Sequence, residues 1–326
     1  MSASAVTITD NQSDLPAPAK RLPRYRRVGN FPAVRVGRPK HLLLQAVGRF
    51  DYLTADQLTR LVYGSKVLNY VRDHLKELYQ DRYLERLYLY PDFDDPSASP
   101  YGSPLAVYCL ASKGIAYLRK MGGTFPQRFN PSEQARRNNR FLRHTIEAND
   151  LLIQCHALAR CDSTSQLVSF TTERELKRNP GVTRLNGKLV KVIPDGWAHI
   201  SRLWPGRTTP NHHYICWELD RGSIEQEAFR KKIRYLIAWL ENGYIDRFQT
   251  TSVNLAFLTT DSPQRVDDMI HWTEAEMGQS RRIDYAPFFL FSNFQQDKVH
   301  PFHVFLEKTW QQPFSDSAVS LLAPPE

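Results

Sequence analysis

Three carboxylates in the second half of the chain have the residue types and spacing of a metal-dependent phosphodiesterase. Asp195 lies in VIPDGWAHI, and Glu218 and Asp220 lie in YICWELDRG. Side chains two residues apart on a strand point to the same face, so we expect Glu218 and Asp220 to share one side. Asp195 approaches them if VIPDGWAHI is the neighbouring strand. Gathered carboxylate oxygens suit Mg²⁺, so the sequence predicts catalytic and metal-binding roles in phosphodiester cleavage for all three acids.

A lysine near these acids would stabilise the transition state, and two candidates follow on the next predicted helix. The arrangement resembles the PD-(D/E)xK nuclease core, in which Pro-Asp precedes an acid, one spacer residue and a lysine. Asp220 stands at the position of that lysine. We expect Lys231 or Lys232 to supply the amine instead, and the sequence leaves both open. In the alternative interpretation, Glu218 and Asp220 only cap the helix or pair with Arg221 and the two lysines.

The segment from residue 38 to residue 125 has the pattern of a winged helix-turn-helix. Apolar residues at helical spacing predict a helix that ends near residue 50. Thr54 and Gln57 form a capping box for a second helix, and Gly64 suits its end. Ser65 can cap a third helix over residues 65–82. The segments YLERLYLY and LAVYCL then alternate like the two strands of a hairpin.

Basic residues predict a polyanionic partner. The formal net charge is +9, and residues 20–40 contain no acid, which is typical of a basic arm; a solvated disordered tail is the alternative. The third helix would read the major groove, and arginines of a long helix from Gln134 to Arg160 would contact phosphates or face solvent. Acids in the expected wing, Asp92, Asp94 and Asp95, leave a protein-binding role open. The predicted DNA contacts are Lys66, Asn69, Lys76, Arg24, Arg26, Arg27, Arg136 and Arg140.

Several segments together resemble one family. The first segments are HLLLQAVGRFDYLTADQLTRLVYG, LYQDRYLERL and VYCLASKGIAYLRK, and they are followed by RHTIEANDLL, VIPDGWAHI and WELDRGSIEQEAFRKKIRYL. Together these segments are similar to the replication-relaxation proteins of plasmids and other mobile elements. The resemblance spans roughly residues 40–245. It implies a role in plasmid replication and DNA relaxation, and it leaves the molecular mechanism open.

The predicted fold class is α+β or α/β, with an N-terminal winged helix and a C-terminal restriction-endonuclease-like α/β domain. The expected units are a disordered basic arm (1–37), the winged helix (38–125), a connecting helix (126–160), the nuclease-like domain (161–310) and a loosely attached tail (311–326). Apolar stretches are too short to cross a bilayer, and the polar start lacks the pattern of a secretory signal. We therefore expect a cytoplasmic protein without a membrane partner.

The sequence favours a DNA-binding protein of plasmid or mobile-element replication and relaxation, acting on double-stranded plasmid DNA as a Mg²⁺-dependent nickase or nuclease. The competing hypothesis is a non-enzymatic replication factor with a degenerate nuclease-like domain that binds DNA or a replication protein. A transcriptional repressor is a third class, for which the expected dimerising helix is not evident in the sequence.

Overall fold

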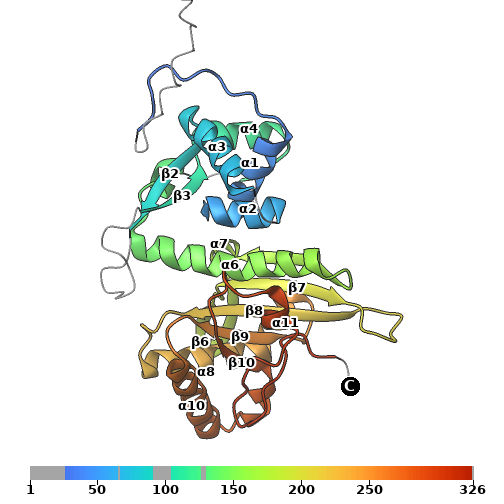
Figure 1. The fold of residues 1–326 in the computed structure, drawn as a ribbon. Helices are drawn as coiled ribbons and strands as arrows, with labels where there is room; N and C mark the ends of the chain where they lie inside the picture. Colours follow the sequence, from blue (N-terminus) through green and yellow to red (C-terminus); the bar gives the residue numbers. More distant parts are fainter. Residues whose placement is uncertain (1–25, 65–66, 91–103, 126–129, 325–326) are drawn as a thin grey trace, which may run out of the picture.

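The computed structural model describes residues 26–64, 67–90, 104–125 and 130–324. The chain is a mixture of helices and sheets, as the α+β expectation requires. A smaller part, built from residues before 126, lies on one side of a long helix, and a larger part built on a five-stranded sheet lies on the other (Figure 1). No helix in the described ranges is both long enough and apolar enough to cross a bilayer.

The smaller part packs three helices on a small antiparallel sheet. The helices are α1 (Arg38–Phe50), α2 (Ala55–Tyr63) and α3 (Leu68–Gln80), and α4 (Ser112–Lys120) follows the sheet. The strand order is β1 (Leu53–Thr54), β3 (Leu105–Leu110), β2 (Leu84–Leu89). The predicted capping box of Thr54 and Gln57 is confirmed at the start of α2, and Gly64 follows its end with a φ of 86°. The predicted Ser65 cap and the acidic wing lie outside the described residues.

The predicted disordered arm is wrong for its described portion, residues 26–37, which packs on the end of α3 and the start of β2. Arg27 donates to the carbonyl oxygens of Tyr79 (2.8 Å) and Leu84 (2.9 Å) and to the carboxylate of Glu85 (2.9 Å). The backbone N–H of Val34 donates to Asp81 Oδ2 at 2.7 Å. The bonds to Tyr79, Leu84 and Glu85 give the guanidinium of Arg27 a structural role within the protein.

The long helix α6 (Asn139–Cys161) is buried from both sides. One side contacts α2, β1 and β2, and the other contacts the large sheet. The predicted continuous helix from Gln134 is wrong, because the short α5 (Pro131–Gln134) ends first and the Asn138 side chain caps α6 by accepting from Phe141 N at 2.8 Å. Arg136 therefore lies before α6, outside the row of side chains expected along it.

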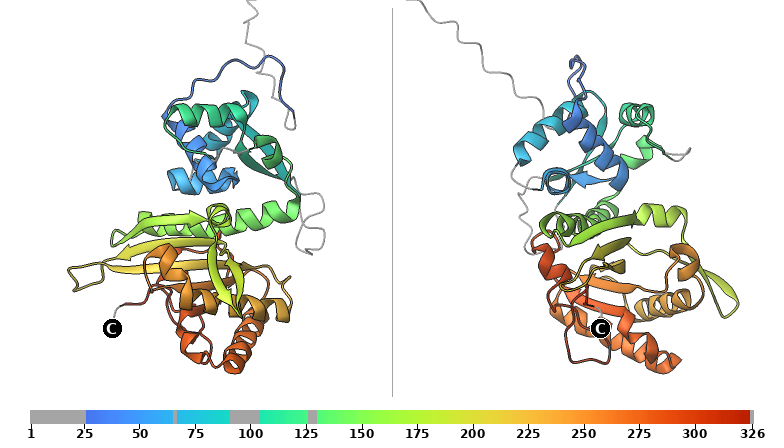
Figure 2. Two further views of the ribbon diagram at one scale, coloured as in Figure 1. Left: turned by 180° about the vertical axis from the view of Figure 1, so that it is seen from behind. Right: turned by 90° about the vertical axis from the view of Figure 1, so that its right-hand side faces the viewer.

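The five-stranded sheet has the order β10 (Phe289–Asn293), β9 (Asn254–Thr259), β8 (Asn211–Asp220), β7 (Gly196–Arg202), β4 (Ser165–Thr172). β7 runs antiparallel to both β4 and β8, whereas β8, β9 and β10 are parallel. Figure 2 shows α6 on one face and the orange helices on the other. These helices are α8 (Gln226–Asn242) and α10 (Pro263–Ser280). The spacing of Ser223 and Gln226 predicts a capping box for α8. That prediction is wrong, because this helix begins at Gln226 without a side-chain cap.

Alternation along β8 sends its side chains into two different cores. Ile215, Trp217 and Leu219 belong to the core shared with α6, whereas Cys216 packs with α8 and α10. The remaining elements are α7 (Glu173–Arg178), the hairpin β5 (Gly181–Leu185) and β6 (Lys188–Val192), α9 (Tyr244–Phe248), the 3₁₀ helix η1 (Ile283–Phe288) and α11 (Pro301–Phe305).

The predicted loose tail from residue 311 is wrong. Leu321 and Leu322 are fully buried. The backbones of Trp310 and Val319 exchange hydrogen bonds of 3.1 and 2.7 Å, and those of Phe291 and Gln311 exchange two of 2.9 Å. The last described residues therefore extend the edge of the sheet beside β10 and close the core under α11.

Asn149 joins α6 to the smaller part, and its replacement should weaken that junction. Its buried Nδ2 donates to the carbonyl oxygens of Phe50 (3.2 Å) and Tyr52 (2.8 Å). Asn149→Ala leaves both buried acceptors without this donor, so we expect the free energy of unfolding in urea to fall by about 1–3 kcal/mol. Asn69→Ala, at an exposed position on α3, is the control and should change it by less than about 0.5 kcal/mol. Equal losses in the two variants would contradict this account.

Candidate active site

Strand register brings several polar side chains to one edge of the sheet. Thr172, the last residue of β4, pairs with Gly196, the first residue of β7, and Gly196 also pairs with Trp217 of β8. Glu173 directly follows β4, Asp195 directly precedes β7, and Glu218 directly follows Trp217. These three carboxylates therefore start from neighbouring points of the sheet edge, and the first half of α6 passes beside them.

Asp195 is held firmly by the backbone of β8. Its N–H donates to the carbonyl oxygen of Trp217 at 2.9 Å, and its Oδ2 accepts from Leu219 N at 2.8 Å. Its other oxygen, Oδ1, lies 3.4 Å from Nε2 of His144 on α6. Burial disfavours the carboxylate, but His144 and Lys232 outweigh it and lower the pKa of Asp195 below its usual value. Asp195 is therefore a fixed anion with one oxygen turned toward α6.

Glu218 forms a buried ion pair with Lys232 of α8. Only 1% of Glu218 is exposed, and burial raises its pKa to about 7 although the ammonium group opposes this rise. Burial acts against the charge of Lys232 as well, but the carboxylates of Glu218 and Asp195 raise its pKa. α8 places Lys232 here because Phe229, Ile233 and Leu236 bury the adjoining side of the helix. Asp195, Glu218 and Lys232 thus form one electrostatically linked group.

Asp220 and Lys231 make their contacts outside this group, although the charge of Asp220 also raises the pKa of Lys232. Asp220 shares a face with Glu218, but its two oxygens accept from Nε (2.7 Å) and Nη2 (3.1 Å) of Arg265 on α10. Gly222 N donates to the same carboxylate at 3.0 Å. Lys231 is exposed, with its Nζ 5.6 Å from the centre of the Tyr235 ring. The expected metal ligand Asp220 is instead a structural anchor for α10, and we exclude both residues from the candidate site.

Two side chains that the sequence did not assign to the site lie against Asp195. His144, Glu173 and Asp195 each offer one nitrogen or oxygen atom, and these atoms all lie within 4.8 Å of one another. The strand-like segment VSFTTERELK favours an ordinary exposed position for Glu173 over a ligand role. In the structure Glu173 is instead the first residue of α7, and Lys177 pairs with it one helical turn later. Burial opposes the charged form of His144, but Asp195 and Glu173 raise its pKa. The available signal was the capping box of Thr172 and Glu175, which ends the strand at Thr172 and starts a helix at Glu173.

A family comparison covers this whole arrangement. A family model described as replication-relaxation matches residues 44–249, which is more than half of the chain. The chain belongs to the replication-relaxation family. This confirms the resemblance noted in the sequence and supports a role in replication and DNA relaxation. The match contains His144, Glu173, Asp195, Glu218 and Lys232. No curated protein and no solved structure matches the chain significantly.

The predicted DNA contacts of this replication-relaxation protein fall into three groups. Asn69, Arg26, Arg136 and Arg140 are exposed, and Lys76 is half-buried. Arg27 is bound within the protein, which removes it from the predicted contacts. Arg24 and Lys66 lie outside the described residues. The exposed arginines 136 and 140 flank the start of α6, a few residues from His144.

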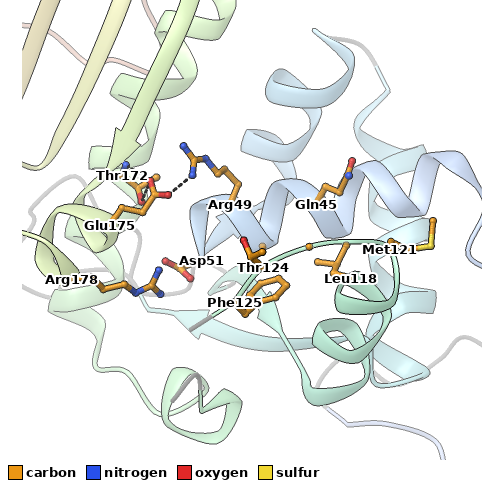
Figure 3. A pocket seen from close by; sticks show the side chains of 12 residues that line it. Gln45, Arg49, Asp51, Leu118, Met121, Thr124, Phe125, Thr172, Glu175 and Arg178 are labelled. Atoms are coloured by element: carbon orange, nitrogen blue, oxygen red, sulfur yellow. Dashed lines mark hydrogen bonds and ion pairs between the residues drawn. The ribbon is translucent and has the colours of Figure 1, made fainter. Parts of the chain in front are cut away.

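Two cavities lie where the smaller part meets the larger one. The first, about 590 Å³, is bounded by α1, the segment after α4, and α7; Arg49 reaches across it to Glu175 (Figure 3). The second, about 280 Å³, is lined by Arg137, Phe141, Glu173 and Lys177 among others. Because Glu173 lines the second cavity, this cavity opens beside the candidate site.

The raised pKa of Glu218 predicts a pH-dependent stability. Between about pH 4.5, the ordinary pKa of a glutamate, and about pH 7, the folded protein keeps a proton on Glu218 that the unfolded chain releases. The contribution of this group is complete at the lower end and is lost as pH rises through about 7. We expect the free energy of unfolding of the wild type, relative to Glu218→Gln, to fall from pH 5 to pH 7.5 in urea titrations. A free-energy difference that rises with pH would contradict this, because it would place the pKa of Glu218 in the folded protein below its value in the unfolded chain.

Proposed function

We propose that this replication-relaxation protein is a divalent-metal-dependent DNA nuclease that nicks plasmid DNA. The observation that carries the proposal is the convergence of Asp195, Glu218 and Lys232. The PD-(D/E)xK core combines two acids on neighbouring strands with one lysine. Here Asp220 occupies the usual lysine position, and α8 brings the amine of Lys232 to Glu218 from another direction. The five-stranded sheet between helical layers is, in this proposal, a restriction-endonuclease-like core.

The donor chemistry of the site fits a hard or borderline divalent cation. Asp195 presents Oδ1 while Leu219 N–H fixes its Oδ2, and Glu218 lies on the adjacent strand. Such an ion would act as a Lewis acid toward a phosphate oxygen and the attacking water; Mg²⁺ is the first candidate. Asp195 would bind and orient the ion, and Glu218 would hold Lys232 in place. Lys232 would place positive charge next to the phosphate, where negative charge develops during the reaction.

The overall reaction is hydrolysis. A water oxygen bonds to phosphorus, one bridging P–O bond to a sugar breaks, and one proton passes from the water to the released oxygen. The smaller part would act as a winged helix on double-stranded DNA, with Asn69 on α3 facing a base edge and Lys76 a phosphate. Arg136 and Arg140 would contact phosphates nearer the site. A cytoplasmic location agrees with this substrate.

A second candidate is a non-enzymatic replication factor that retains a degenerate nuclease-like domain. The observation in its favour is that Asp220 is sealed by Arg265 and that Glu218 is almost fully buried. In this case the ion pairs would serve stability, and the protein would bind plasmid DNA or a replication protein without cutting.

Cleavage separates the two candidates. We expect the wild type to convert supercoiled plasmid to the nicked form with Mg²⁺ or Mn²⁺, and Asp195→Asn or Lys232→Met to lower the rate at least about 100-fold. Lys231→Met is the matched control, because it removes the neighbouring exposed amine, and its rate should stay within about threefold. If all of these proteins bind DNA and none nicks it, the non-enzymatic candidate is correct.

The salt dependence of DNA binding tests the arginines. Each phosphate contact contributes about 0.9 to the slope of log K against log salt. We expect the double variant Arg136→Ala, Arg140→Ala to reduce the magnitude of this slope by up to about 2, measured by fluorescence anisotropy on a plasmid-derived duplex.

The control for this measurement is the double variant Arg184→Ala, Lys188→Ala in the hairpin of β5 and β6, where both side chains are exposed. It lowers the net charge equally, so its slope should match that of the wild type. Equal slopes for all three proteins would remove Arg136 and Arg140 from the DNA-binding surface.

A further inference from the structure

His144, Glu173 and Asp195 come from three different elements and meet at one point. α6 supplies His144, the first turn of α7 supplies Glu173, and the residue before β7 supplies Asp195. Their ligand atoms lie within 4.8 Å of one another. We propose that these three side chains form a binding site for a transition-metal dication, Mn²⁺ or Zn²⁺. A catalytic role for this metal rests on the proposed function. Metal binding by itself does not require that the protein cleaves DNA.

The spacing of His144 and Asp195 suits two ligands of one ion. Nε2 and Oδ1 are 3.4 Å apart, which exceeds the usual 2.7–3.2 Å of an N–H···O hydrogen bond. Two ligand atoms that each lie about 2.1 Å from a tetrahedral ion are separated by about 3.4 Å. Both atoms can therefore bind one cation that lies beside the line joining them, with little movement of either side chain.

Neighbouring groups orient these ligands, as is usual around metal sites. Leu219 N–H occupies Oδ2 of Asp195, so Oδ1 is the oxygen that faces His144. Lys177 pairs with Oε1 of Glu173 and so fixes the position of this carboxylate. His144 keeps 30% of its side chain exposed, so the site has access to solvent. Three protein ligands leave at least one coordination position for water or a phosphate oxygen.

The nitrogen ligand decides which cation fits. Mg²⁺ and Ca²⁺ prefer all-oxygen surroundings, whereas imidazole combined with carboxylates suits Mn²⁺, Fe²⁺ and Zn²⁺. Asp195 is shared with the Glu218–Lys232 pair, so an ion held by His144 lies next to the proposed reaction site. The expected consequence is a preference for Mn²⁺ over Mg²⁺, in contrast to the Mg²⁺ expected from the carboxylates alone.

Metal binding is measured first, on the full chain after removal of metals with a chelator. We expect calorimetric titration to give one Mn²⁺ and one Zn²⁺ site, with affinity at least about tenfold lower in His144→Ala and in Glu173→Gln. His271→Ala, at an exposed position on α10, is the matched control and should retain wild-type affinity. Circular dichroism checks that each variant is folded. Pulsed EPR of bound Mn²⁺ should show coupling to an imidazole nitrogen that disappears in His144→Ala.

The outcomes distinguish this proposal from the nuclease proposal. Nitrogen-coupled Mn²⁺ binding that is lost in His144→Ala but kept in His271→Ala supports the site, even if no protein nicks DNA. Absence of tight Mn²⁺ and Zn²⁺ binding, or equal binding by wild type and His144→Ala, overturns it. In that case His144 and Asp195 form only an ion pair, and nicking with Mg²⁺ by the same preparation would leave the proposed function intact.

Discussion

The buried pairing of Glu218 with Lys232 sets the main physical constraint on the larger part of the protein. Moving a carboxylate and an ammonium group out of water costs several kcal/mol for each ion, and their attraction offsets this only in good geometry. α8 must therefore keep one position on the sheet, the one that brings Lys232 next to Glu218. The apolar side of α8, with Phe229 and Ile233 fully buried, provides this position. The raised pKa of Glu218 shows that burial is only partly compensated by the amine.

The same constraint makes the register of β7 and β8 matter for the site. Asp195 is fixed by two hydrogen bonds to the β8 backbone, at Trp217 and Leu219, on either side of Glu218. A shift by one residue would turn Glu218 toward the core shared with α6 and expose Trp217 to the helices on the other face. The buried side chains of Trp217 and Leu219 oppose such a shift, so apolar packing on one face fixes the charges on the other.

The sequence predicted the parts of the site that depend on local periodicity. Strand alternation placed Glu218 and Asp220 on one face, and the charge pattern placed Lys231 and Lys232 on the helix that follows. It could not choose between Lys231 and Lys232, because that choice depends on how α8 lies on the sheet. It also missed the pairing of Asp220 with Arg265, which lies 45 residues later. His144 and Glu173 meet Asp195 only through the packing of α6 and the register of β4, and neither leaves a periodic signal.

The fold shows the same division between local and long-range information. The capping box of Thr54 and Gln57 was readable because both residues lie within one turn. The break before Asn138 and the packing of residues 26–37 depend on partners such as Glu85 that are distant in sequence. A basic segment looks like a solvated arm when the acceptors of its side chains are unknown. Arg27 binds two carbonyl oxygens and a carboxylate. Counting basic residues in the sequence therefore overestimated how many of them are available to bind DNA.

The degree of pairing separates the three predicted acids in a way that bears on function. Asp220 has both oxygens bonded to Arg265 and a further bond from Gly222, as expected of an acid that only stabilises the fold. Asp195 has one oxygen satisfied by the backbone and the other facing His144 beyond ordinary hydrogen-bond distance. Glu173 lies close to the same two side chains, and two carboxylates this near to each other repel unless positive charge lies beside them; Lys177 and a protonated His144 supply part of that charge. A bound cation would supply the rest, since it turns the repulsion between Asp195 and Glu173 into shared attraction.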